Sequence, residues 1–98
     1  GIDLQVLRIQ RYRLLLNFID AQPATLQRLL QFAGDEKNVT NIAECIGSWD
    51  YEVSIEVYNS DELTSFINRL HDAFGGQLVE VQSLAVNRYR KFQMMPGE

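Results

Sequence analysis

The strongest constraint on the fold is a strict alternation of apolar and polar residues over residues 51–57, YEVSIEV. Because successive side chains of a strand point to opposite faces, this pattern predicts a β-strand with one buried face. The residues before it are Gly47-Ser48-Trp49-Asp50, in which glycine and aspartate favour a tight turn. A turn does not need a large aromatic residue. The role of Trp49 at this hairpin tip is therefore the main question that the sequence raises.

The remaining elements follow from apolar spacing and from helix start and stop signals. In order, we expect a strand over 11–19, a helix from Pro23 to a stop at Gly34-Asp35, a strand over 38–46, the strand over 51–57, a helix capped by Asn59 and Glu62 and ended by Gly75-Gly76, and a strand over 77–92. The alternation of the last strand changes phase near Gln82-Ser83, which predicts a bend there.

The element order βαββαβ predicts the ferredoxin-like α+β fold. Two right-handed crossovers give a four-stranded antiparallel sheet in the order 4-1-3-2, with both helices on one face. The first strand is more apolar than one face requires: if Leu14, Leu16 and Phe18 face the helices, Leu15 and Ile19 face away. We therefore expect a homodimer formed through the open sheet face, and we leave higher oligomers open.

The composition excludes several classes of protein. With 98 residues, 46% of them hydrophobic and 22% charged, the chain predicts one soluble, cytoplasmic domain without a membrane partner. Cys45 is the only cysteine and His71 the only histidine. An internal disulfide is therefore impossible, and no metal site or cofactor is expected. We interpret Cys45 as a small buried residue, and we expect no catalytic role for His71.

The charge is distributed unevenly along the chain, whose net charge is −4. Residues 1–13 and 88–98 each carry three basic residues against one acidic residue, which leaves three basic and eleven acidic residues between them. Each basic end contains the tripeptide RYR, at 11–13 and at 88–90, and the topology brings the two together. They could contact another domain or deter edge-to-edge aggregation, two interpretations of equal weight. Contact with DNA phosphates ranks behind both.

The hairpin residues Gly47-Ser48-Trp49-Asp50-Tyr51, taken with this element order, resemble the effector-binding and dimerisation domain of the Lrp/AsnC family of prokaryotic transcription regulators. In that family the hairpin reads Thr-Gly-x-aromatic-Asp, and here Ile46 stands in the place of the threonine. The opening GIDLQVLRIQRYRLLLNF is similar to the family segment that joins a helix-turn-helix to the first strand.

The resemblance implies a non-enzymatic regulatory domain whose DNA-binding half is absent from this sequence. Residues 1–10 would be the linker from that half, and residues 11–98 the effector-binding and oligomerisation domain. Small effectors such as amino acids would bind at subunit interfaces, and DNA only through the missing part. The ligand-binding positions carried over from the family are Gly47, Ser48, Trp49, Asp50, Gly75, Gly76 and Gln77. Because Ile46 lacks the threonine hydroxyl, a regulator that has dropped its effector is also an alternative.

Each of these positions also has a purely structural interpretation. Trp49 could cover the end of the core and Asp50 could fix the turn through amide hydrogen bonds, rather than wall a site and bind an ammonium group. Gly75-Gly76 could simply end a helix. Two other functions share the fold: a dimeric α+β barrel enzyme or ligand carrier, and an ACT-like allosteric module of a metabolic enzyme. The enzyme would have to use Glu52, Glu56, Glu80 or His71.

Overall fold

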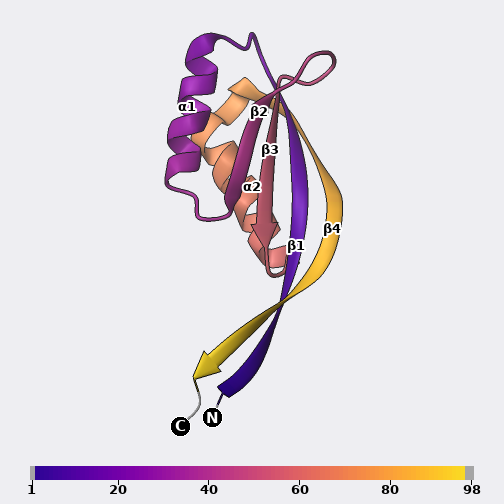
Figure 1. The fold of residues 1–98 in the computed structure, drawn as a ribbon. Helices are drawn as coiled ribbons and strands as arrows, with labels where there is room; N and C mark the ends of the chain where they lie inside the picture. Colours follow the sequence, from indigo (N-terminus) through magenta and orange to yellow (C-terminus); the bar gives the residue numbers. More distant parts are fainter. Residues whose placement is uncertain (1, 97–98) are drawn as a thin grey trace.

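The computed structural model describes the backbone of residues 2–96 and the side chains of residues 8–86. The elements are β1 (Ile2–Phe18), α1 (Pro23–Gly34), β2 (Val39–Glu44), β3 (Tyr51–Val57), α2 (Ser60–Phe74), the short 3-10 helix η1 (Gly75–Gln77) and β4 (Leu78–Pro96). The strands form one antiparallel sheet in the order β2-β3-β1-β4, and both helices cover the same face of it (Figure 1). The predicted ferredoxin-like α+β fold and its strand order are confirmed.

The core lies between the sheet and the two helices. All four apolar residues of the alternating strand β3 are buried, as the pattern predicts. On β1, Leu14 and Leu16 are completely buried against the helical layer, where α2 contributes the equally buried Phe66. Phe18 packs edge-on against Phe74, with ring centroids 5.1 Å apart. Burial of these aromatic and branched side chains supplies most of the driving force for folding.

Both helices begin where the capping signals predict. Thr25 Oγ1 accepts a hydrogen bond of 3.1 Å from the backbone N–H of Gln22, just before Pro23 opens α1. At α2, Asn59 Oδ1 accepts from the Glu62 N–H at 2.9 Å. The Glu62 carboxylate accepts in turn from the N–H of Tyr58, one residue before the expected Asn59. These bonds satisfy amides that the first helical turn leaves without a partner.

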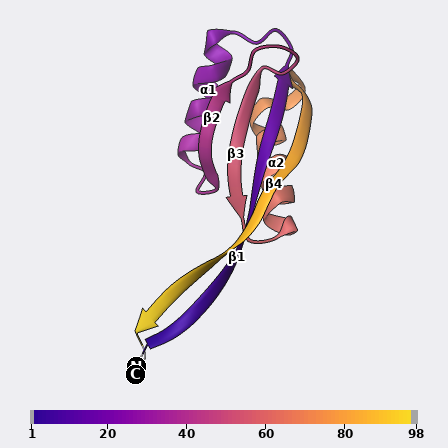
Figure 2. The ribbon, with the colours of Figure 1, turned by 45° about the vertical axis from the view of Figure 1, so that its right-hand side comes forward.

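Strands β1 and β4 are longer than predicted. Beyond the end of β3, β1 and β4 continue as a pair from Ile9 opposite Tyr89 to Ile2 opposite Pro96. We call residues 2–9 and 89–96 the ribbon arm. Figures 1 and 2 show it twisting and leaving the helices behind, so that the chain measures 57 Å along its longest axis against 23 and 21 Å. The predicted strand start at residue 11 is therefore wrong, because residues 2–10 are already paired with β4.

The irregularities of β4 differ from the predicted bend. The register runs without a break through Gln82 and Ser83, which lie opposite Leu15 and Leu14. It shifts instead at Val79 and at Val86, each an extra residue on β4. Two bulges on either side of residues 82–83 reset the alternation, so the sequence shows the change of phase but not its position.

The two RYR segments lie next to each other on the paired strands. Arg11 pairs with Asn87, and Arg88 pairs with Gln10, so the segments adjoin along the ladder rather than face each other directly. The side chains of residues 88–90 lie outside the described residues, and the role predicted for the segments stays a prediction.

Candidate functional site

Two loops predicted as ligand-binding are attached to the same end of β1. On one side, Asp50 at the tip of the β2–β3 hairpin accepts a hydrogen bond of 2.8 Å from the Phe18 N–H through its Oδ2. On the other side, the N–H of Ile19 donates to the carbonyl of Gln77 at 2.8 Å. The successive amides of Phe18 and Ile19, at the end of β1, therefore hold the hairpin tip and η1. The structure thus brings the two predicted groups to one end of the sheet.

Asn17 ties the hairpin tip down, a role that the sequence analysis missed. Its Nδ2 donates to the Ser48 carbonyl at 2.9 Å and to Glu80 Oε1 at 3.4 Å, while its Oδ1 accepts from the Asp50 N–H at 2.9 Å. Gly47 has a φ of 114°, a conformation that residues with a side chain rarely adopt. The Asn17 side chain is thus one of the groups of β1 that fix the hairpin tip.

Asp50 fixes the turn through amide hydrogen bonds, which is the structural interpretation given for it above. Besides the bond from Phe18, its backbone N–H donates to the Leu16 carbonyl and its carbonyl accepts from Cys45, both at 3.0 Å. A carboxylate that accepts an amide hydrogen bond is well suited to hold such a turn. Contact between Asp50 and a ligand stays a prediction.

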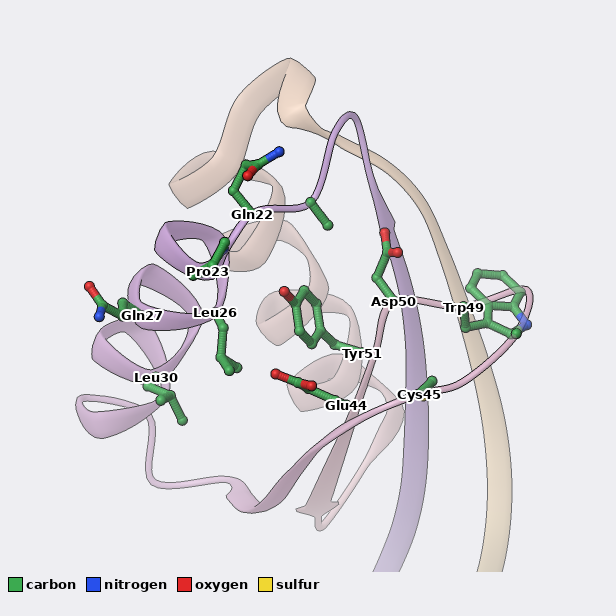
Figure 3. A pocket seen from close by; sticks show the side chains of 12 residues that line it. Gln22, Pro23, Leu26, Gln27, Leu30, Glu44, Cys45, Trp49, Asp50 and Tyr51 are labelled. Carbon is green, nitrogen blue, oxygen red and sulfur yellow. The ribbon is translucent and has the colours of Figure 1, made fainter.

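An open pocket of about 460 Å³ lies between α1 and the hairpin. Its apolar wall comes from α1, and acidic and hydroxyl groups come from the end of β2 and the start of β3 (Figure 3). The lining residues that carry its character are Pro23, Leu26, Leu30, Glu44, Asp50 and Tyr51. Its volume falls within the range of roughly 300–1,000 Å³ that small-molecule sites occupy.

Trp49 borders this pocket without pointing into it. Figure 3 shows its indole ring on the far side of the hairpin from α1. The side chain is half-buried and does not belong to the core cluster. Trp49 therefore does not cover the end of the core, and its ring stays partly exposed to solvent at the hairpin tip.

The pocket has a negative electrostatic character. Burial raises the pKa of the Tyr51 hydroxyl above its ordinary value, and the charges of Glu44 and Asp50 raise it further. The pKa of the Cys45 thiol is raised in the same way, first by burial and then by Glu52 and Asp50. None of the described residues that line the pocket is basic. A cationic group would therefore be favoured there.

The residues of the second predicted group serve the end of α2. Gly75 has a φ of 56° and follows the last helical residue, as a helix-ending glycine does. Gln77 Oε1 accepts from the Arg28 guanidinium, which also donates to the Ala73 carbonyl at 3.1 Å. Arg28 also lies 4.9 Å from the centre of the Phe74 ring. Gln77 lines a separate cavity of about 300 Å³, so the two predicted groups do not share one pocket.

The groups considered for an enzyme do not converge. Glu52 and Glu56 form ion pairs with Arg13 and Arg11 on the open sheet face, at 3.0 and 2.8 Å. Glu80 accepts a hydrogen bond from Asn17 on the same face. The exposed His71 belongs to α2, on the opposite side of the sheet. Among the side chains that the structure describes, no group of acidic, histidine and cysteine residues could hold a metal ion. No helix in the described range is long and apolar enough to cross a membrane.

Comparisons with known proteins give structural matches only. No protein-family model matches the sequence, and no curated protein matches it significantly. The fold is similar to that of MtbAldR (TM-score 0.67, 12% identity) and of an AsnC family transcriptional regulator from Agrobacterium tumefaciens (0.68, 14%). It is also similar to FFRP-DM1 (0.64, 12%). The expected resemblance to Lrp/AsnC regulators is confirmed at the level of the fold.

The matches differ in how much of each chain they cover. About 80% of this chain aligns with MtbAldR and 82% with the Agrobacterium regulator, but it spans only about half of their length, 51% and 50%. With FFRP-DM1, 80% of this chain covers 99% of the other. The common part is therefore one domain of the two longer proteins.

Proposed function

We propose that this chain is the regulatory domain of a prokaryotic Lrp/AsnC-like transcription regulator. The observation that supports this most is the shared fold of three solved structures, two of which extend well beyond the matched domain. On this proposal, residues 1–10 lead from a DNA-binding part, and DNA is contacted only through that part. Because residues 2–9 belong to the ribbon arm, the connection would leave the molecule at the tip of the arm, away from the hairpin.

The hairpin pocket supports a small effector with an ammonium group and an apolar side chain. Glu44 and Asp50 supply negative charge on one side, and Leu26 and Leu30 supply an apolar wall on the other. An amino acid combines both features.

Titration calorimetry against the standard amino acids tests this. Asp50→Asn keeps an oxygen that can accept from the Phe18 amide but removes the charge, so it should weaken binding by about 1.5–3 kcal/mol with little change in melting temperature. Glu44→Gln should act in the same direction, and Asp72→Asn, on the exposed part of α2, is the matched control. If no amino acid binds the unmodified chain at millimolar concentration, the effector part of the proposal is wrong.

We propose further that two copies pair through the open sheet face. Leu15 is half-buried there, opposite Glu52 and Gln82, and Leu84 is 41% exposed opposite Arg13. Apolar groups on a strand face that no helix covers favour a second copy. Light scattering at micromolar concentration should give at least twice the chain mass, and Leu15→Arg should break the pair. A monomeric wild type would contradict this pairing.

DNA binding should be absent from the isolated chain. Its acidic middle repels phosphates, and neither helix is a free recognition helix because both pack on the sheet. A mobility-shift titration with duplex DNA at physiological salt checks this. Sequence-selective binding at nanomolar concentration would show that the DNA-binding function lies in this domain.

A further inference from the structure

The Tyr51 side chain ends in a hydroxyl that the fold leaves available to the hairpin pocket. Tyr51 is only 6% exposed, and its ring packs edge-on against Phe18 with ring centroids 5.8 Å apart. Its hydroxyl forms no hydrogen bond with any residue that the structure describes. Figure 3 shows this hydroxyl on the side of the ring that faces α1, where the pocket lies. A well-buried side chain thus offers the pocket a free hydrogen-bonding group.

Two carboxylates adjoin this hydroxyl. Glu44 pairs directly opposite Tyr51 on the β2–β3 ladder, so the two side chains share one face of the hairpin. Glu44 has no hydrogen bond or ion pair within the described part of the chain. Asp50 accepts from the Phe18 amide through Oδ2 only, which leaves Oδ1 available. Three oxygen acceptors therefore line one pocket, and a primary ammonium group has three N–H donors.

The same lining has no group that would hold a carboxylate. In an amino acid, the ammonium and carboxylate groups are attached to one carbon atom, so an ammonium bound to Glu44 and Asp50 carries its carboxylate close to them. None of the described lining residues is basic. The carboxylate of the ligand would therefore meet like charges without a compensating cation.

Helix α1 does not supply the missing donors either. It begins with Pro23, which has no N–H. The N–H groups of Thr25 and Leu26 already donate to the carbonyl of Gln22. The guanidinium of Arg28 is hydrogen-bonded at the end of α2 and lines a different cavity. The start of α1 is thus a poor site for an anion.

We propose that the hairpin pocket binds primary alkylamines in preference to the amino acids with the same side chain. Glu44, Asp50 and Tyr51 accept hydrogen bonds from the ammonium group, and the alkyl chain lies against Leu26 and Leu30. The inference rests on the proposed function in one respect, namely that this pocket holds a small ligand with an ammonium group. An amino acid would use the same contacts, but its carboxylate would weaken binding.

The first experiment is titration calorimetry of the whole chain with four probes that share one branched side chain. Isoamylamine is leucine without its carboxylate, isocaproate is leucine without its amino group, and leucinamide has the size of leucine without the negative charge. Isoamylamine should bind on the order of 10- to 100-fold more tightly than leucine, because no carboxylate is left unpaired. Leucinamide should bind more like the amine than like leucine, and isocaproate should bind more weakly than leucine.

Two results of this titration would overturn the inference. Leucine that binds as tightly as isoamylamine would show that the pocket accepts a carboxylate. Leucinamide that binds as weakly as leucine would show that size, rather than charge, sets the preference.

The second experiment adds the missing cation. Leu30 is 52% exposed on α1, so a long, unbranched side chain is tolerated there. Leu30→Lys should lower the ratio of amine affinity to leucine affinity about tenfold or more, because its ammonium group can pair with the carboxylate of leucine. Leu30→Met, which is similarly long and uncharged, is the matched control and should leave the ratio unchanged. Equal ratios in the two variants would contradict the inference.

The third experiment tests the hydroxyl. Tyr51→Phe should weaken isoamylamine binding on the order of 10-fold, because one acceptor for the ammonium group is lost. Tyr58→Phe, at an exposed residue just after β3 that does not line the pocket, is the control and should have no effect. Equal effects of the two substitutions would exclude the assigned role of Tyr51.

The outcomes separate this inference from the proposed effector. Leucine bound more tightly than isoamylamine would overturn the inference and leave the amino-acid effector in place. Binding of the amine without binding of any amino acid would support the inference and remove the amino-acid effector. If none of the probes and no amino acid binds at millimolar concentration, both are wrong.

Discussion

The two ends of β1 are built from the same strand pairing but have different surroundings. From Leu14 to Phe18, β1 lies between β3 and β4, is covered by both helices and is tied to the hairpin through Asn17. From Ile2 to Ile9, it pairs with β4 alone and extends away from the helices (Figure 2). A two-stranded ribbon is at best marginally stable in water. Backbone pairing therefore extends the shape of this molecule, while the covered half carries its stability.

The largest expected effect belongs to the covered half. Phe66→Ala removes a completely buried ring that packs 5.7 Å from Phe32, so unfolding free energy should fall by about 3–5 kcal/mol. Urea denaturation followed by circular dichroism measures this. A loss below about 1 kcal/mol would mean that the covered half is not the stability-determining part.

A smaller effect is expected at the hairpin end of β1. Asp50→Ala leaves the Phe18 amide without its carboxylate acceptor, which should cost about 1–3 kcal/mol in unfolding free energy. Asp72→Ala, on the exposed surface of α2, should cost less than about 0.5 kcal/mol. Thermal melting of both variants measures the two losses. Equal losses would show that the hairpin tip is not fastened to β1 as strongly as its hydrogen bonds indicate.

The pH dependence should also mark this end of the molecule. Folding raises the pKa of the Tyr51 hydroxyl above 10.0, through burial and through Glu44 and Asp50, so the folded state favours the neutral phenol. The unfolded chain loses that proton first as pH rises past this value. Stability should therefore fall through the same range. Denaturation midpoints of wild type and Tyr51→Phe should diverge there and agree near neutral pH; parallel curves would exclude this contribution.

The smallest effect is expected from the arm. Deleting residues 1–7 and 91–98 keeps the buried Ile9 and removes most of the ribbon, so the unfolding free energy should change by less than about 1 kcal/mol. Denaturation of this shortened chain beside the full chain measures the difference. A loss comparable to that of Phe66→Ala would show that the arm is part of the folding unit, for instance because a second chain covers it.

The parts of the fold that sequence predicts well are those fixed by local rules. The alternation over residues 51–57 and the Asn59 cap depend on neighbours within a few positions, and the structure confirms both. The arm depends on pairing between residues 2–9 and 89–96, at opposite ends of the chain, so no local pattern distinguishes it from a linker. The bulges at Val79 and Val86 are settled by the same distant pairing.

The candidate site divides in the same way. The glycine and aspartate of the hairpin can be recognised as turn formers from the sequence alone. Their hydrogen bonding to Asn17 cannot, because it joins residues more than thirty positions apart. In the sequence, Asn17 is only a polar residue within an apolar strand, and nothing in that pattern indicates which residues it contacts. The pocket itself combines α1 with the hairpin, a pairing that no motif in the sequence indicates. Which loops share a pocket is decided by tertiary packing rather than by motif.

The pairing of Ile2 with Pro96 makes the chain almost a closed ring. Because the two strands arrive side by side, a few residues of linker could join the ends covalently, and the polypeptide could be reopened in an exposed turn such as the one between β3 and α2. Such a circular permutant would keep every strand neighbour while moving the point of synthesis and attachment to another part of the surface. The location of the two ends of β1 and β4 is thus set by the order in which the elements are connected, and it could change while the strand neighbours of the sheet stay the same.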